Sequence, residues 1–164
     1  IVGDDERAAA EAEEHLLERA TELDLTGDAE LDLGLYRLAK GPENVAAAER
    51  HLRISSTRLA NAGTFVALGN ALAAQNRLRE AKGEYERAVG LHPGSLKAQL
   101  NLAEVDRRLG DLASARRHME AARIIAPYHP KLLDLVDRID VDDANALSEE
   151  LERIDVDDDA DPAR

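Results

Sequence analysis

Apolar and polar residues follow a helical pattern along this chain, and the pattern repeats. Two stretches between residues 62 and 129 superpose when the chain is shifted by 34 residues. Apolar positions recur in them every three or four residues, as on one face of an α-helix, and no stretch alternates as a β-strand does. The superposed pairs are Ala81 and Ala115, Tyr85 and Met119, Ala88 and Ala122, and Pro93 and Pro127. A repeat of this length predicts an all-α array of helical hairpins, each burying its apolar face against its neighbours.

The clearer copy, residues 62–95, has small residues where two helices would cross. Glycine inside a helix costs about 1 kcal/mol relative to alanine, so we expect Gly69 and Ala81 to mark a contact too close for larger side chains. The whole pattern consists of Phe65, Leu68, Gly69 and Leu72 on a first helix, Ala81, Tyr85 and Ala88 on a second, and Pro93 after it. It resembles the tetratricopeptide repeat family. The resemblance implies a right-handed α-α solenoid of stacked hairpins, with a concave groove that binds other proteins.

The sequence indicates two further repeats, one on each side of this copy. Residues 96–129 form a degraded repeat, with Gln99, Ala103 and Asp106 where the family has aromatic, glycine and aromatic residues. Residues 27–61 form another repeat if two residues are inserted near Pro42, which suits the first turn of a helix. We therefore predict hairpins over about 27–61, 62–95 and 96–129.

The two ends of the chain depart from the repeat. Residues 4–25 are predicted to form a lone helix, either the second helix of an interrupted repeat or an N-terminal cap. Residues 131–139 and 144–154 have helical apolar spacing and are predicted to form a C-terminal capping hairpin over 130–154. Residues 1–154 would then be one solenoid, followed by an acidic disordered tail, 155–164. The chain starts without methionine, which suggests a fragment or a processed product.

Composition narrows the classes of function. The 164 residues carry a formal net charge of −13, which disfavours nucleic acid as a partner because phosphate binding needs a basic face. No apolar run approaches membrane-spanning length, so we expect a soluble protein without membrane insertion by this segment. The absence of cysteine excludes disulfides and thiol catalysis. It fits the cytoplasm, which we favour, and also the periplasm.

The histidines and the acidic C-terminal run are candidates for catalysis or metal binding, but their spacing does not support either role. His15, His51 and His118 recur at one repeat position, which places them on different hairpins, too far apart to share a metal. The acidic run from Asp155 lacks the glycine and the terminal glutamate of a calcium loop, because Ala160 stands at the turn and the chain stops at residue 164. No nucleophile, base and oxyanion donors can be assembled. We expect neither catalysis, nor metal, nor cofactor.

The first helix of each hairpin lines the concave groove in the family that this chain resembles. Asn70 and Asn101 match two asparagines that hold the peptide backbone in peptide-binding members, and an amide can both donate and accept. The alternative is that both simply reflect the family consensus. Lys131 matches one cation of the subgroup that grips chaperone C-termini, but Val66 and Leu135 replace two others, so a strict chaperone clamp is not expected. The predicted ligand-binding residues are Asn70, Lys97, Asn101, Arg107, Arg108, Lys131 and Arg138.

These residues predict a non-enzymatic module that binds a protein or peptide in the groove as a scaffold or adaptor. The ligand would be acidic or would present a C-terminal carboxylate, unless Glu104 and Asp134 neutralise the cations. One alternative is a scaffold that self-associates through the solenoid ends or the convex face, with homo-oligomers as the result. Another is an accessory domain of an enzyme whose catalytic part lies elsewhere.

Overall fold

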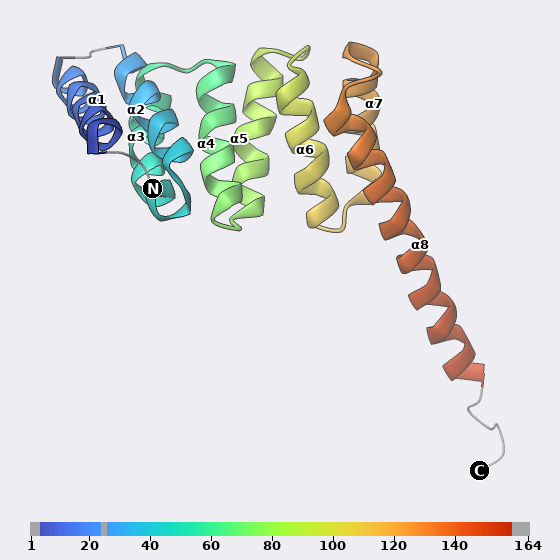
Figure 1. The fold of residues 1–164 in the computed structure, drawn as a ribbon. Helices are drawn as coiled ribbons and strands as arrows, with labels where there is room; N and C mark the ends of the chain where they lie inside the picture. Colours follow the sequence, from blue (N-terminus) through green and yellow to red (C-terminus); the bar gives the residue numbers. More distant parts are fainter. Residues whose placement is uncertain (1–3, 24–25, 159–164) are drawn as a thin grey trace.

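The computed structural model describes residues 4–23 and 26–158, and the chain folds there into helices alone. The elements are α1 (Asp4–Leu23), α2 (Asp28–Lys40), the 3₁₀ helix η1 (Pro42–Asn44), α3 (Val45–Arg58), α4 (Ala62–Ala74), α5 (Leu78–Leu91), α6 (Leu96–Arg108), α7 (Leu112–Ile125) and α8 (Pro130–Asp158). The pairs α2 and α3, α4 and α5, and α6 and α7 pack as antiparallel hairpins and follow one another in a row (Figure 1). The predicted all-α solenoid is confirmed.

Polar side chains and special backbone angles set where these helices start and turn. Three helices begin at a residue whose side chain accepts a hydrogen bond from a backbone amide of the first turn. These caps are Asn61 to Thr64 at 2.9 Å, Ser95 to Ala98 at 3.3 Å and Asp111 to Ser114 at 3.0 Å. The turn of the second hairpin contains Asn76 at φ 59°, and the turn of the third contains Gly110 at φ 81°. Equivalent positions of the repeat thus adopt the left-handed conformation, which asparagine and glycine tolerate best.

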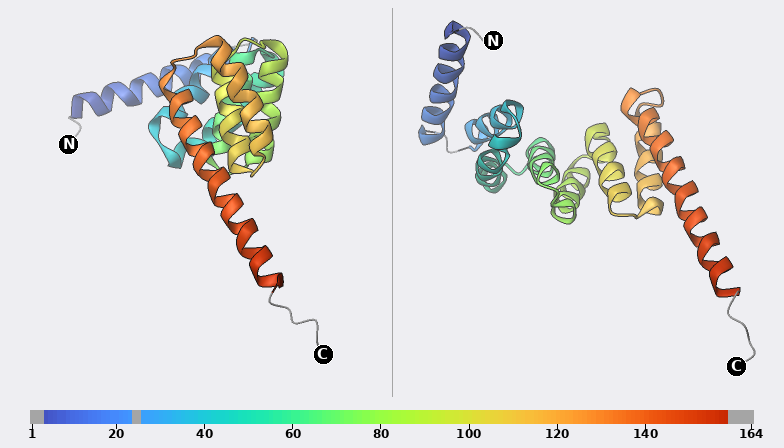
Figure 2. Two further views of the ribbon diagram at one scale, coloured as in Figure 1. Left: turned by 90° about the vertical axis from the view of Figure 1, so that its right-hand side faces the viewer. Right: turned by 60° about the horizontal axis from the view of Figure 1, so that its bottom comes forward.

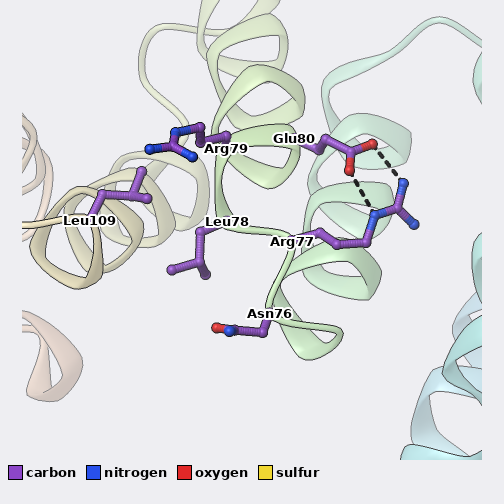
Figure 3. Close-up of a pocket in the computed structure, with 6 residues that line it drawn as sticks. All are labelled: Asn76, Arg77, Leu78, Arg79, Glu80 and Leu109. Atoms are coloured by element: carbon purple, nitrogen blue, oxygen red, sulfur yellow. Dashed lines mark hydrogen bonds and ion pairs between the residues drawn. The ribbon is translucent and has the colours of Figure 1, made fainter.

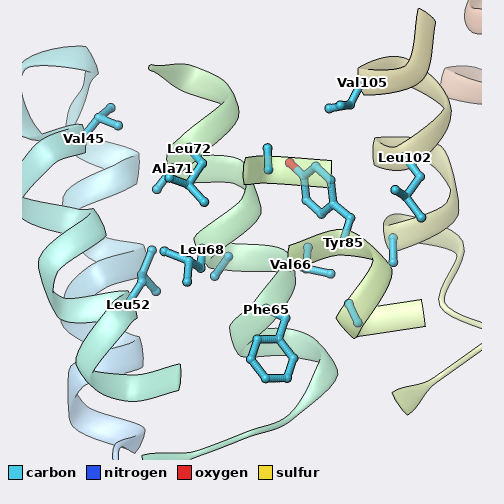
Figure 4. Close-up of a cluster of buried hydrophobic side chains, with 14 residues drawn as sticks. Val45, Leu52, Phe65, Val66, Leu68, Ala71, Leu72, Tyr85, Leu102 and Val105 are labelled. Atoms are coloured by element: carbon cyan, nitrogen blue, oxygen red, sulfur yellow. The ribbon is translucent and has the colours of Figure 1, made fainter. Parts of the chain in front are cut away.

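The main core lies between α3, α4, α5 and α6 (Figure 4). Phe65 and Tyr85 are 3% and 2% exposed, so the two aromatic residues fill it as predicted. A Cβ atom on Gly69 would lie 2.4 Å from the Tyr85 ring, and one on Gly34 would lie 2.6 Å from Leu52. The glycines therefore allow the close crossing of the first and second helices, at the cost in helix propensity that glycine brings.

The degraded repeat keeps the fold by replacing apolar contacts with polar ones. Asp106 is fully buried and takes the place that Leu72 holds one repeat earlier. Its Oδ1 accepts a hydrogen bond of 2.6 Å from Lys82 Nζ, and its Oδ2 lies 3.7 Å from His118 Nε2. The other ring nitrogen of His118 lies 2.8 Å from Gln99 Oε1. A buried polar cluster thus joins α5, α6 and α7 where the repeat usually has aromatic residues.

The C-terminal prediction is wrong. Residues 130–158 form the single helix α8, which packs on α6 and α7 and then continues past the body of the solenoid (Figures 1 and 2). No glycine or proline lies between residues 131 and 158, so nothing in the chain forces a break. At the point of the expected turn, Arg107 binds Asp142 at 2.7 Å and Arg116 binds Asp143, which holds the helix against the solenoid. Residues 155–158 of the expected disordered tail are helical, and residues 159–164 lie outside the described residues.

Candidate functional site

One face of α6 carries the residues that were expected to line the groove. Lys97, Asn101, Glu104 and Arg108 follow one another at spacings of four, three and four residues, which places them on one side of a helix. This side faces hollows that α4 and α8 also line. The candidate site is therefore a groove between successive first helices, with a pocket toward each end.

The first pocket, which we call the amide pocket, has a volume of about 400 Å³. Its residues come from α4, from the first two turns of α6 and from the start of α8. They are Asn70, Leu96, Lys97, Leu100, Asn101, His129 and Lys131. Four of the seven predicted site residues thus meet in one pocket, although they are spread over 62 positions of the chain, from 70 to 131 inclusive.

A chain of hydrogen bonds orients the polar groups of the amide pocket. Tyr85 Oη and Asn101 Nδ2 both donate to Asn70 Oδ1, each at 2.8 Å. Lys131 Nζ donates to Asn101 Oδ1, also at 2.8 Å. Both amide oxygens are thereby engaged within the protein. The groups left for a ligand are mainly N–H donors, so the pocket suits a ligand rich in acceptors, such as backbone carbonyls or carboxylates.

The cations of this pocket have no carboxylate close by. Neither Lys97 nor Lys131 has an acidic oxygen within 4 Å among the described residues. Burial lowers the pKa of Lys131, and the charges of Arg138 and Lys97 lower it further, whereas Glu104 opposes the shift. An anion placed beside Lys131 would relieve this unfavourable environment of the ammonium group.

The second pocket lies toward the other end of α6 and has a volume of about 610 Å³. We call it the arginine pocket. Its residues are Asn76, Leu78, Arg107, Arg108, Gly110, Leu112, Asp142 and Ala146. Arg108 is exposed there and donates to Asn76 Oδ1 at 2.8 Å, with no carboxylate within 4 Å in the described ranges. It is free to bind an anion.

Two of the predicted cations are already neutralised. Arg107 binds Glu104 at 3.1 Å and Asp142 at 2.7 Å, and these hydrogen bonds raise its pKa. Arg138 binds Glu104 at 3.1 Å and Asp134 at 2.9 Å. The cross-repeat pairing that the sequence left open thus occurs for Arg107 and Arg138. It does not occur for Lys97, Arg108 or Lys131.

Sequence reasoning did not identify every residue of the site. His129, at the edge of the amide pocket, was interpreted as a loop residue, but its Nδ1 accepts the backbone N–H of Lys131 at 3.2 Å and so caps α8. Asp142 was missed because a break in the helix was expected just there. The signals for a helix start at this point were the proline after His129 and the helical apolar spacing of residues 131–139.

A third hollow has a structural explanation (Figure 3). It has a volume of about 240 Å³ and is lined by residues of the turn before α5, by the first turn of α5 and by Leu109, which follows α6. Arg77 binds Glu80 at 2.6 Å and the nearly buried Glu49 at 2.8 Å. The Arg77–Glu49 pair joins the start of α5 to α3, so this surface holds neighbouring repeats together.

The described residues contain neither a metal site nor a membrane-spanning segment. No group of three or more His, Asp or Glu side chains lies close enough to hold a metal ion within residues 4–23 and 26–158. None of the helices in these ranges combines the length and the apolar character that crossing a bilayer requires.

Comparisons with known proteins agree with the geometry. Residues 72–139 match the family model described as tetratricopeptide repeat. Among solved structures, MamA has a TM-score of 0.69 at 19% identity, and the match covers 94% of this chain and 98% of that one. YrrB, described as a tetratricopeptide repeat protein with an unusual peptide-binding site, has a TM-score of 0.70 at 20% identity over 80% of this chain and 68% of that one.

A third structure contains a bound peptide. The second tetratricopeptide repeat domain of human RPAP3, in complex with the HSP70 peptide SGPTIEEVD, has a TM-score of 0.63 at 18% identity. The match covers 68% of this chain and 92% of that domain. A comparison with curated protein sequences found no match. At these identities, the structural matches establish the fold alone.

Proposed function

Because residues 72–139 match the tetratricopeptide repeat family model and the chain has the fold of tetratricopeptide repeat structures, we propose that it binds an extended segment of another protein in the groove along α4, α6 and α8. The observation that carries the proposal is the amide pocket. Asn70, Asn101 and Lys131 come from three successive first helices and form one hydrogen-bonded row that presents donors to the groove. Donors spaced along a groove suit the carbonyl groups of an extended peptide.

The proposed ligand is acidic or ends in a free carboxylate. Lys97, Lys131 and Arg108 lack carboxylate partners within 4 Å among the described residues, and they lie in pockets toward the two ends of the groove. The protein as a whole is negative, with a formal net charge of −13. A negative ligand would therefore be repelled by most of the surface and attracted at these two pockets, which favours selective over general binding.

The module acts by binding rather than by catalysis, as a scaffold or an adaptor. The groove contains amides, ammonium and guanidinium groups, together with two carboxylates and one imidazole. The carboxylates of Glu104 and Asp142 bind arginine, and His129 caps α8, so none of them is placed to activate a nucleophile. The bound peptide of the RPAP3 domain and the peptide-binding site of YrrB support this role, because both proteins share the fold.

An array of random nonapeptides tests the proposal. It carries acidic, neutral and basic sets, each with free and amidated C-termini, and is probed with the labelled protein. We expect enrichment of acidic peptides, stronger for free C-termini, and about tenfold weaker binding by Lys131→Ala. Arg123→Ala is the matched control, since it removes one exposed charge on α7, outside the groove. Equal binding by wild type and by both Asn101→Ala and Lys131→Ala would rule out the groove.

A further inference from the structure

One row of equivalent groove positions changes its charge along the array. The position of Lys97 on α6 recurs as Lys131 on α8, 34 residues later, and as Gly63 on α4, 34 residues earlier. On α2 the equivalent residue is Asp28, when the two glycines at which α2 and α4 cross their partner helices are aligned. From α2 to α8 the row therefore consists of Asp28, Gly63, Lys97 and Lys131, and all four residues are exposed.

The α2 end of the groove combines negative charge with an apolar surface. Asp32 follows Asp28 by one helical turn, and Leu35, on the same side of the helix, is 42% exposed. Asp32 has no cation within 4 Å among the described residues, and Arg37 of the same helix is bound by two glutamates of α1. This end is thus opposite in charge to the amide pocket, where Lys131 lacks an acidic partner.

We infer that the groove binds its ligand in one direction, with a C-terminal carboxylate in the amide pocket and a basic residue upstream on α2. The side chain of this arginine or lysine would place its charge beside Asp32 and its aliphatic part on Leu35, because long basic side chains pack their stems on apolar surface while the charge stays in water. The inference rests on the proposed function. It adds the direction of the ligand and a second requirement for its sequence.

The dimensions of the array set the spacing between the two charges of the ligand. Successive first helices contact each other from α2 to α8, and the axes of packed helices lie about 8–10 Å apart. Helix α2 therefore lies about 20–25 Å from the space between α6 and α8. An extended chain covers about 3.3 Å per residue, so the basic residue should come about six to eight residues before the C-terminus.

The same row disfavours a ligand that is acidic throughout. Its C-terminal acids would be attracted by Lys97 and Lys131, but its upstream acids would meet Asp28 and Asp32, and like charges repel each other. Between the two ends, α4 presents the uncharged Gly63. The groove therefore selects a segment with acids at its C-terminus and a cation upstream.

A positional set of peptides tests the inference. Each is a nonapeptide of serine and threonine that ends in two aspartates with a free carboxylate, and one of its first seven positions carries arginine or glutamate. In isothermal titration with the whole chain, arginine at the first three positions should raise affinity about threefold to fivefold over the peptide without it. Asp32→Lys should cancel this gain and favour glutamate there instead. Asp140→Lys is the matched control, because Asp140 is an exposed acid on the side of α8 opposite Lys131.

Two other variants separate this inference from the proposed function. Lys131→Ala should weaken every peptide of the set by about tenfold, wherever the arginine lies, because it removes the cation that binds the carboxylate. Leu35→Ser should reduce the gain from arginine and leave the peptide without arginine unaffected.

The inference is overturned if none of the peptides binds, if arginine gives no gain or the same gain at all seven positions, or if the gain survives Asp32→Lys. Binding that still depends on Lys131 would then leave the proposed function standing. If neither Asn101→Ala nor Lys131→Ala changes binding, the ligand lies outside the groove, and the proposed function fails together with the inference.

Discussion

Asn101 Nδ2 donates a hydrogen bond of 2.8 Å to Asn70 Oδ1, and this bond joins two successive first helices of the solenoid. Asn101 is only 8% exposed, and its oxygen is engaged by Lys131. The amides are therefore oriented before a ligand arrives, so binding loses little side-chain entropy.

Removing either amide should weaken every peptide ligand of the groove. We expect Asn70→Ala and Asn101→Ala to lower affinity by about tenfold whatever the peptide sequence, because these groups would bind the backbone. Isothermal titration with peptides selected from the array measures the effect. Asn145→Ala, at an exposed site on α8, is the control. A loss confined to a few sequences would mean that the amides contact side chains instead.

The adjacent arginines of α6 should behave differently. Arg108 lacks a carboxylate partner within 4 Å in the described part of the chain, so Arg108→Ala should weaken acidic peptides and reduce the salt dependence of their binding. Arg107 is held by Glu104 and Asp142, so Arg107→Ala should instead loosen α8. Titrations in low and high salt, together with hydrogen exchange of α8, separate the two effects. If Arg107→Ala instead weakens the binding of acidic peptides and Arg108→Ala loosens α8, the ion pairs of Arg107 open on binding.

Tyr85 should be the most costly aromatic residue to remove. It is 2% exposed, packs against Gly69 and donates to Asn70. We expect Tyr85→Ala to lower the free energy of unfolding by about 3 to 5 kcal/mol. Tyr85→Phe keeps the ring and should cost about 1 kcal/mol, through the lost hydrogen bond. Urea unfolding measures both. An unchanged midpoint for Tyr85→Ala would contradict the register of the repeat.

The two partners of the buried ion pair should respond unequally. Lys82→Ala leaves the fully buried Asp106 carboxylate without its cation and should cost about 3 kcal/mol of unfolding free energy. Asp106→Leu restores the residue type of Leu72 and leaves Lys82, whose side chain is 27% exposed, able to reach solvent. It should change stability by less than about 1 kcal/mol. Urea unfolding measures both variants. Equal losses of unfolding free energy would show that leaving Lys82 without Asp106 costs as much as leaving Asp106 without Lys82.

The half-buried His118 should make stability depend on pH. Burial lowers the pKa of His118 below its ordinary value of 6.5, and Lys82 and Arg117 lower it further, against the opposing charges of Asp106 and Glu86. Near pH 6 the folded state therefore binds fewer protons than the unfolded state, and the free energy of unfolding falls as pH falls through 6.5.

His118→Gln isolates this contribution, since it removes the titrating group and leaves the other acids and bases in place. Urea midpoints at pH 7.5 and pH 5.5 should differ less for this variant than for wild type. Parallel shifts in the two proteins would mean that His118 is equally easy to protonate in the folded and unfolded chains.

The sequence by itself determined the repeat, and the period of the repeat determined most of the architecture. Each hairpin buries a face that only a neighbour can cover, so apolar spacing, small residues at the crossing and a terminating proline are enough to predict the array. The same register identified Asn70, Asn101 and Lys131 as residues of one surface. They occupy different positions of the repeat, since the 34-residue shift relates Asn70 to Glu104 and Lys131 to Lys97, but each of these positions was predicted on the groove side of a first helix.

Only the tertiary structure decided which charges remain available and how the chain ends. Arg107 and Arg108 are adjacent in sequence, yet one is held by Asp142 and the other is not, because that aspartate reaches α6 only through the uninterrupted α8. Helix α8 continues because no residue breaks it and because its carboxylates bind arginines of other helices. Ion pairing depends on distances between helices, and the pattern along one helix does not contain those distances.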